Sequence, residues 1–194
     1  METNTIKSVL VIGIALTLLS FDLPLGWYKS GSEPFSYDMG IEIGGGRDGK
    51  NTATIKSKAQ KIDGFGTLMQ QFIPNKYLGK RIRLTGYIKA EKVIEGAGFW
   101  LRVEQANSIQ SLAMDNMKDR PIKGTTFWKK VEIVLDVPQN ASKISYGAYL
   151  KGTGQIWFDN LSFEIVSSRF VPITGKPADR KIIKPYPLNL NFDY

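Results

Sequence analysis

Alternating apolar and polar positions dominate the chain after its first twenty residues. Each alternating stretch places successive side chains on opposite faces of an extended backbone, which is typical of a β-strand. The longer stretches are Arg81–Lys89, Phe99–Gln105, Val131–Val137, Ile144–Leu150 and Ile156–Ile165. Shorter candidate strands are Tyr37–Ile43, Thr52–Ser57, Thr67–Phe72 and Ser111–Asn116.

Turn signals separate these stretches, and no part of the chain beyond residue 20 shows a sustained 3.6-residue apolar period. The turns include a run of three glycines at 44–46, Asp63-Gly64, Pro74-Asn75 and a Gly-rich stretch at 151–154. Many short strands joined by such turns predict an all-β fold. We therefore expect one antiparallel β-sandwich domain of the jelly-roll type over residues 21–166.

The first twenty residues form a hydrophobic segment. Lys7 precedes the apolar run Val9–Leu19, which has the length of a signal-peptide core and falls short of the roughly 20 residues of a membrane span. Residues 1–20 are interpreted as a signal peptide cut near Ser20, or as an uncleaved anchor that gives the only contact with a membrane. Export makes the protein secreted, periplasmic or cell-surface. A buried first strand or helix is the alternative, and the protein is then cytoplasmic.

The last part of the chain, residues 167–194, contains prolines and basic side chains and shows little periodicity, which is typical of an extended tail. Within it, Leu190–Asp193 repeats three of the four letters of Leu19–Asp22. Chance, an incomplete second copy and an edge strand all explain this echo.

Composition narrows the chemistry. The 194 residues include no Cys and no His, which excludes disulfides, thiolate nucleophiles, the Ser-His-Asp triad and most transition-metal sites. The formal net charge is +8, and the basic residues are scattered along the chain, which favours a generally basic surface over a dedicated nucleic-acid site. A Gly-rich stretch, Gly44–Asn51, has the frame of a phosphate-binding loop. It lacks the Ser or Thr after Lys50 and the following helix, so a hairpin is expected instead.

Several short motifs resemble a family of bacterial jelly-roll modules that is similar to the carbohydrate-binding modules of the galactose-binding-like fold. The likeness covers roughly residues 21–165. Its marks are Trp27-Tyr28, Gly46–Lys50, Tyr77–Arg81, Trp128–Lys130, Leu135–Pro138 and Gly154–Asn160. The resemblance implies a non-catalytic module that binds a glycan or polysaccharide, and some relatives lie beside transcription regulators.

The outward side chains of Phe99–Gln105 have the composition of a sugar-binding platform. Alternation predicts that Trp100, Arg102 and Glu104 share one face, where an aromatic ring can stack on a pyranose and charged groups can bind its hydroxyls. Further candidate ligand-binding residues are Arg83, Tyr87, Asp115 and Asn116. An ordinary solvated face with cross-strand ion pairs explains the same residues. Trp27, Trp128 and Trp157 are expected to be structural.

The position of Asp159 in the alternation of its strand suggests a cation site. Counted with Trp157, Leu161 and Phe163, Asp159 falls on the inward side of its strand, where a carboxylate requires hydrogen bonds or a metal. The resemblance implies a structural calcium, held by one acid near the first strand and one in the last strand, and Asp22 and Asp159 occupy those positions. Backbone carbonyls would complete the shell. Hydrogen bonds from backbone N–H groups to Asp159 are the alternative.

The sequence therefore predicts an extracytoplasmic, non-catalytic carbohydrate-binding domain, with three alternatives. The first is a protein-interaction or structural sandwich. The second is a binder of single-stranded nucleic acid or another anionic polymer, which the charge and exposed aromatics would suit. The third is a glycosidase, for which Glu104 and Asp115 are the candidate carboxylate pair.

Overall fold

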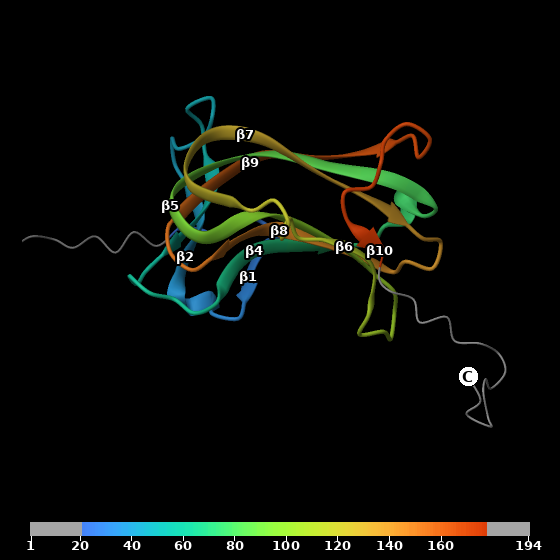
Figure 1. Cartoon of the computed structure of the whole chain (residues 1–194), viewed down its shortest axis with the longest axis horizontal. Helices are drawn as coiled ribbons and strands as arrows, with labels where there is room; N and C mark the ends of the chain where they lie inside the picture. Colours follow the sequence, from blue (N-terminus) through green and yellow to red (C-terminus); the bar gives the residue numbers. More distant parts are fainter. Residues whose placement is uncertain (1–20, 178–194) are drawn as a thin grey trace, which may run out of the picture.

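The longest strand, β5 (Lys80–Glu104), runs through both layers of the fold and joins them (Figure 1). The structure is a computed structural model, of which residues 21–177 are described. The first half of β5 pairs with β7 (Ile122–Val137) and β9 (Gln155–Val166). Its last nine residues pair with β8 (Lys143–Lys151), and the end of that stretch also pairs with β6 (Ser111–Asp115).

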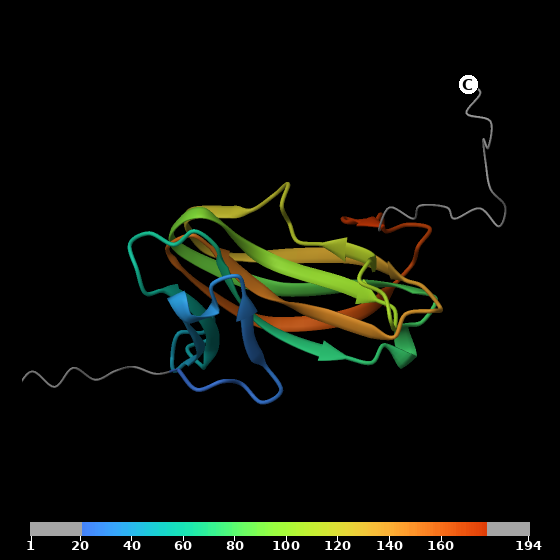
Figure 2. The same cartoon turned by 90° about the horizontal axis from the view of Figure 1, so that it is seen from below.

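The strands form two layers, and every pairing is antiparallel. Layer A contains the last nine residues of β5 with β8 and β6, and layer B contains the first half of β5 with β7 and β9. Layer A adds β4 (Phe65–Phe72) and β1 (Tyr28–Gly31) beyond β8, and β10 (Lys176–Pro177) beyond β6. Layer B adds β3 (Thr52–Ser57) and β2 (Tyr37–Glu42) beyond β9. Figure 2 shows the strands of layer A side by side. The sandwich predicted from the alternation is confirmed.

Helical structure in residues 21–177 is limited to two single-turn 3-10 helices, η1 (Pro34–Ser36) and η2 (Asn75–Tyr77). No helix in this part of the chain is long and apolar enough to cross a membrane.

Inward side chains of both layers form one core between them. On β5, alternation directs Ile82, Leu84 and Ile88 inward from layer B and Phe99 and Leu101 inward from layer A, all fully buried. Burial of such side chains stabilises the fold by about 2 kcal/mol each. Trp27 packs on the edge of this core, with its ring 5.4 Å from that of Tyr146 and 6.0 Å from that of Phe158. The structural role expected for Trp27 fits this packing.

The expected strands are present, but their extents differ. Arg81–Lys89 and Phe99–Gln105 are two ends of the single strand β5, because the residues between them also pair with β7, through three register shifts. These irregularities break the alternation that marks a strand in sequence. Strand β7 begins at Ile122 rather than Val131, and β1 carried no sequence signal.

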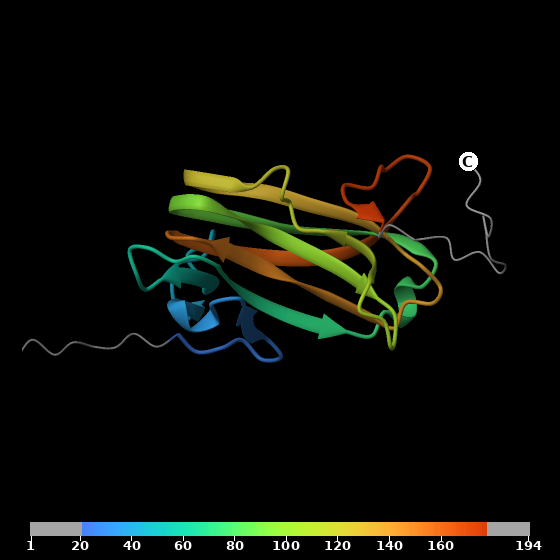
Figure 3. The same cartoon turned by 60° about the horizontal axis from the view of Figure 1, so that its bottom comes forward.

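The first part of the expected tail folds back along the sandwich (Figure 3). The Thr174 N–H donates to the carbonyl of Val134 at 3.0 Å, and β10 pairs with β6. The guanidinium of Arg81 donates to the carbonyls of Ser168 and Val171 at 3.1 and 2.6 Å. Residues 1–20 and 178–194 lie outside the described part, and with them the predicted signal peptide or anchor, its cleavage site and the Leu190–Asp193 echo.

Candidate functional site

A groove of about 590 Å³ crosses the outer face of layer A. Its floor is largely apolar and its rim is mostly cationic. It is lined by Ser30, Gly31, Phe65, Thr67, Met69, Glu95, Gly96, Trp100, Arg102, Met114, Asn116, Lys118, Pro121, Lys123, Tyr149 and Lys151. Trp100, Arg102 and Asn116 were predicted as ligand-binding residues, and the structure brings these three together.

Trp100 lies in the groove with its indole held by hydrogen bonds. Its Nε1–H donates to the hydroxyl of Thr67 at 2.8 Å, and that hydroxyl donates to the carbonyl of Ala148 at 2.7 Å. The position paired with Trp100 on β8 is Gly147, so no side chain competes for the space beside the ring. The half-buried ring is therefore fixed in orientation before any ligand arrives, which lowers the entropic cost of stacking a ligand on it.

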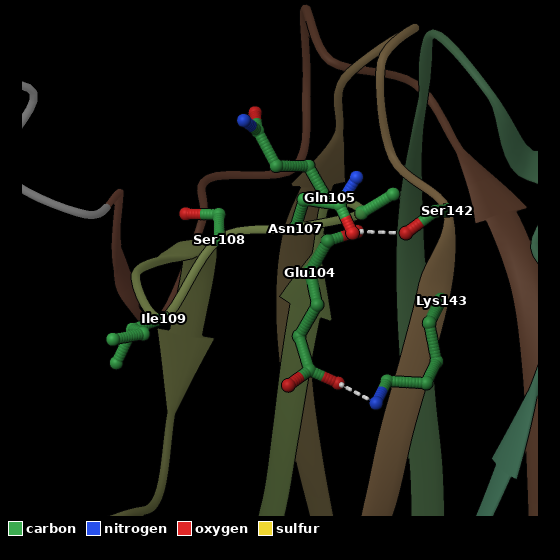
Figure 4. Close-up of a pocket in the computed structure, with 8 residues that line it drawn as sticks. Glu104, Gln105, Asn107, Ser108, Ile109, Ser142 and Lys143 are labelled. Atoms are coloured by element: carbon green, nitrogen blue, oxygen red, sulfur yellow. Dashed lines mark hydrogen bonds and ion pairs between the residues drawn. The ribbon is translucent and has the colours of Figure 1, made fainter.

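Glu104 anchors the charged side chains at one end of the same face. Its Oε1 lies 2.7 Å from Nη2 of Arg102, and its Oε2 lies 3.2 Å from Nζ of Lys143 and accepts a 2.7 Å hydrogen bond from Ser145. Figure 4 shows Glu104 and Lys143 pointing toward one another from β5 and β8. The carboxylate is only 17% exposed and both oxygens are engaged, so it positions Arg102 and is poorly placed to bind a ligand itself.

A smaller hollow of about 550 Å³ lies at that end, between Glu104, Lys143 and the loop that follows β5 (Figure 4). The loop projects Ile109 fully into solvent, and Ser108 closes a local turn by accepting the N–H of Gln110. The polar groups that line this smaller hollow are therefore engaged in contacts that shape the loop. The groove around Trp100 is the better candidate site.

Asp115 is turned away from the groove although its neighbour Asn116 lines it. Its carboxylate, 4% exposed, accepts hydrogen bonds from Arg120 at 2.6 and 3.2 Å, from Thr174 at 2.6 Å and from the Met117 N–H at 2.8 Å. Burial raises the pKa of Asp115, and these hydrogen bonds more than offset it, so the pKa is lowered overall. A lowered pKa is the opposite of what a general acid requires. Through its hydrogen bond with Thr174, Asp115 holds the segment after β9 against β6.

Arg83 and Tyr87 lie on the outer face of layer B, away from Trp100. Strand β5 passes from one layer to the other between Tyr87 and Trp100, so outward side chains at its two ends face opposite sides of the sandwich. Arg83 lies 3.0 Å from Glu164 and 3.5 Å from Glu132. The guanidinium of Arg47 lies 3.5 Å from the ring centre of Tyr87. The structure thus divides the predicted platform between two faces.

Asp159 also lies on the outer face of layer B. Strand β9 has one extra residue opposite β5, between Ser162 and Asp159, and Asn160 adopts a left-handed backbone with φ 54°. This bulge reverses the alternation, so Ile156 and Phe158 point inward and Asp159 does not. Its Oδ1 accepts the Asn160 N–H at 2.7 Å. The inward orientation predicted for Asp159 is therefore wrong.

The same bulge places Trp157 outside the core. Its ring is buried on the outer face of layer B, where its indole N–H donates to Glu42 at 2.9 Å and Lys89 lies 4.0 Å from its centre. Trp128, half-buried on β7, lies 5.8 Å from the same Lys89 amine. Both rings are held in place on the surface that faces away from the groove.

The two residues expected to hold calcium, Asp22 and Asp159, both lie in the described part of the chain. Asp22 is exposed before β1, and its backbone carbonyl accepts the N–H of Ile41 at 2.8 Å. Within residues 21–177, no group of three or more acidic or other metal-binding side chains is arranged to hold an ion. A calcium site at Asp22 and Asp159 remains a prediction.

Some groove residues carried no usable sequence signal. Tyr149 lies in the expected strand Ile144–Leu150, and the structure pairs it with Gly98, two residues from Trp100. Lys118, Pro121 and Lys123 follow β6 in an irregular segment and at the start of β7, where periodicity says nothing about position. The pairings of β6 and of the start of β7 with β5 bring them beside Trp100.

Solved structures similar to this chain define the fold class. The CBM22-1 xylan-binding domain of Paenibacillus barcinonensis Xyn10C matches 77% of this chain and 91% of its own, with 12% identity and a TM-score of 0.54. The Stig cyclase Fisc from Fischerella sp. TAU matches 75% of this chain and 87% of its own, with 14% identity and a TM-score of 0.55. The fold is therefore that of carbohydrate-binding modules, which cyclases share.

A curated protein of Bacillus subtilis is similar in sequence. It is named as the uncharacterized HTH-type transcriptional regulator YbfP, and 169 residues are 44% identical, covering 87% of this chain. The chain spans 56% of the length of that relative. No protein-family model matches the chain.

This relative corrects the function expected from sequence. The prediction of an extracytoplasmic binding function is wrong, because the similar protein is named as a transcriptional regulator. The sequence motifs that suggested the module are marks of the fold, and a shared fold does not carry a shared role. They correctly predicted the architecture.

Proposed function

We propose that this β-sandwich is the ligand-binding domain of a protein of the transcriptional-regulator type, and that it binds a soluble saccharide ligand in the groove of layer A without transforming it. The observation that carries the proposal is the preformed groove around Trp100, whose ring is fixed by Thr67 and whose rim supplies charged hydrogen-bond donors. Apolar stacking combined with a few polar groups is the usual composition of a small-ligand site.

Two further observations support a binding role in a regulator. The similarity to YbfP covers most of the chain, and residues 21–177 contain no α-helix, so a helix-turn-helix motif does not lie within them. The described part of this chain would then supply ligand recognition, and DNA recognition would come from a different element. The similarity in fold to a xylan-binding domain favours a saccharide as the ligand.

Two side-chain environments support binding over catalysis. Glu104 is paired with Arg102 and Lys143, and the pKa of Asp115 is lowered by its hydrogen bonds. The lowered pKa of Asp115 is the opposite of what the acid of a glycosidase requires, and both oxygens of Glu104 are engaged within the protein.

A thermal-shift and calorimetric screen of the full chain against soluble mono- and oligosaccharides tests this function. We expect at least one ligand to raise the melting temperature, and Trp100→Ala to abolish its binding while leaving the fold intact. Trp128→Ala removes a half-buried Trp from the opposite layer and serves as the matched control. Sequence-specific binding of duplex DNA by the full chain, with no saccharide bound, would overturn the proposal.

A further inference from the structure

Cationic side chains gather around the groove of layer A with little compensation. Arg102, Lys118, Lys123 and Lys151 line it, and Glu95 is the one carboxylate among its lining residues. Glu95 is already engaged, because its Oε2 lies 2.9 Å from Nζ of Lys151. A groove that collects charge of one sign over an apolar floor raises the local concentration of ions of the opposite sign.

Lys118 and Lys123 are the uncompensated charges. Neither has a carboxylate oxygen within 4.0 Å among residues 21–177, whereas Lys151 has one and Arg102 has Glu104. They enter the same groove from the segment after β6 and from the start of β7. The two amines therefore converge on one space from separate elements.

The outer face of layer B shows the contrasting arrangement. Arg81 makes a bidentate pair with Asp136, at 2.7 and 2.9 Å, and Arg83 lies between two glutamates. Both arginines there are ion-paired within the protein, although the buried Nε of Arg83 makes no hydrogen bond in the described part of the chain. Around Trp100, Lys118 and Lys123 line a largely apolar groove with no carboxylate beside them.

Arg102 retains donors as well. Its Nη2 faces Glu104, and its buried Nε has no hydrogen-bond partner in the described part of the chain. The Nε is sealed from solvent, so only the exposed part of this side chain, which is 38% exposed, could donate to an anionic ligand oxygen in the groove. Charge-assisted hydrogen bonds of this kind are the strong ones in a binding site.

Resting on the proposed function, we infer that the groove selects a saccharide that carries an anionic group, a carboxylate or a phosphate. The apolar face of the sugar ring stacks on Trp100, and the anionic group lies toward Lys118 and Lys123. Tyr149, whose pKa is raised chiefly by burial, stays neutral and lines the same space as a hydroxyl donor. A neutral sugar would use the ring and leave both amines without a counter-ion.

Calorimetric titration of the full chain with three matched ligand sets tests this inference. The sets are hexuronic-acid oligomers, hexose phosphates and neutral xylo-oligosaccharides of comparable length. We expect one anionic set to bind about tenfold more tightly than the neutral set at low salt, because two amines near one charge supply roughly that factor. The advantage should shrink as salt rises, since exposed charges are screened. The set that wins distinguishes carboxylate from phosphate.

Paired variants separate the charges from the stacking platform. In Lys118→Gln/Lys123→Gln we expect the anionic advantage to fall to within about threefold of the neutral ligand. Lys56→Gln/Lys58→Gln removes the same charge from exposed positions outside the groove and should change nothing. Circular dichroism and melting temperature confirm that each variant is folded.

The possible results overturn different claims. Equal or tighter binding of neutral sugars, unaffected by the Lys118/Lys123 substitutions but abolished by Trp100→Ala, would overturn the anionic inference and leave the proposed function standing. Binding that is insensitive to Trp100→Ala, or no saccharide binding by the folded chain, would overturn the proposed function. Loss of the anionic advantage in both lysine pairs alike would also overturn the inference, since overall charge would then explain it.

Discussion

Removing the carboxylate of Asp115 gives the sharpest test of how the edge of the sandwich is held. The substitution Asp115→Ala leaves the Met117 N–H without its acceptor and the Thr174 hydroxyl with only a 3.4 Å contact to the Val134 carbonyl. Arg120 keeps the exposed Asp119 and a 3.5 Å contact to the Glu132 carbonyl. Each lost hydrogen bond to a charged acceptor costs about 1 kcal/mol or more. Arg120 is one-third exposed and can rehydrate, so its contribution is discounted. We expect a loss of about 3 kcal/mol.

Equilibrium urea unfolding followed by tryptophan fluorescence measures that loss. Asp119→Ala is the matched control, because it removes another carboxylate from the same arginine at a position 77% exposed, and we expect less than about 0.5 kcal/mol. A loss below about 1 kcal/mol for Asp115→Ala, or equal losses for the two variants, would refute this account of the Asp115 network.

The same network predicts a pH dependence with a definite sign. The pKa of Asp115 is lowered in the folded protein, so its contribution to stability is complete above the pKa of the unfolded chain, about 3.9. It is lost as the pH falls through the lower, folded-state value. The stability difference between the natural chain and Asp115→Asn should be constant from neutral pH down to about pH 5 and shrink below pH 4. A difference that grows in acid would contradict the assignment.

Three other predictions concern the core and the edge of the sandwich. Gly147→Ala should destabilise the fold by at least about 2 kcal/mol in a thermal melt, because a Cβ there would lie 2.3 Å from the Leu68 carbonyl oxygen, and an unchanged melting temperature would contradict this. The pKa of Tyr37 is raised to about 12, chiefly by burial, so its contribution to the stability of the fold is complete below pH 10 and is lost as the pH rises toward 12. Tyr37→Phe should remove this alkaline loss of stability and itself cost about 1 kcal/mol. Arg81→Ala should speed amide exchange in residues 168–174 and leave β8 unaffected, and equal exchange in both proteins would show that Arg81 does not hold this segment.

The strand pattern could be predicted because burial acts on every second side chain. Phe99, Leu101 and Val103, which alternate with Trp100 and Arg102 along the strand, are fully buried. The same rule placed Trp100 and Arg102 on one outward face, and both line the groove. Local pattern was sufficient where a strand stayed regular and in one layer.

The rest of the site depends on features that alternation does not encode. A single strand that passes between layers divides Tyr87 from Trp100, and the bulge at Asn160 reverses the phase of Asp159. Lys118 and Lys123 reach the groove because β6 and the start of β7 both pair with β5. Asp115 is held by hydrogen bonds from Arg120 and Thr174, and both of these residues lie outside the strands that alternation predicted. These are long-range contacts, which a single sequence does not reveal.

The indole N–H signals of the four tryptophans offer the most direct test of the central claim, which is that the groove of layer A binds the ligand. In ¹⁵N-labelled full chain, Trp100 reports on the groove, Trp128 and Trp157 report on the opposite face, and Trp27 reports on the core edge. Titration with a saccharide that raises the melting temperature should shift the Trp100 signal, assigned through Trp100→Phe, and leave the other three in place. A shift of Trp128 or Trp157 with Trp100 unchanged would contradict the account.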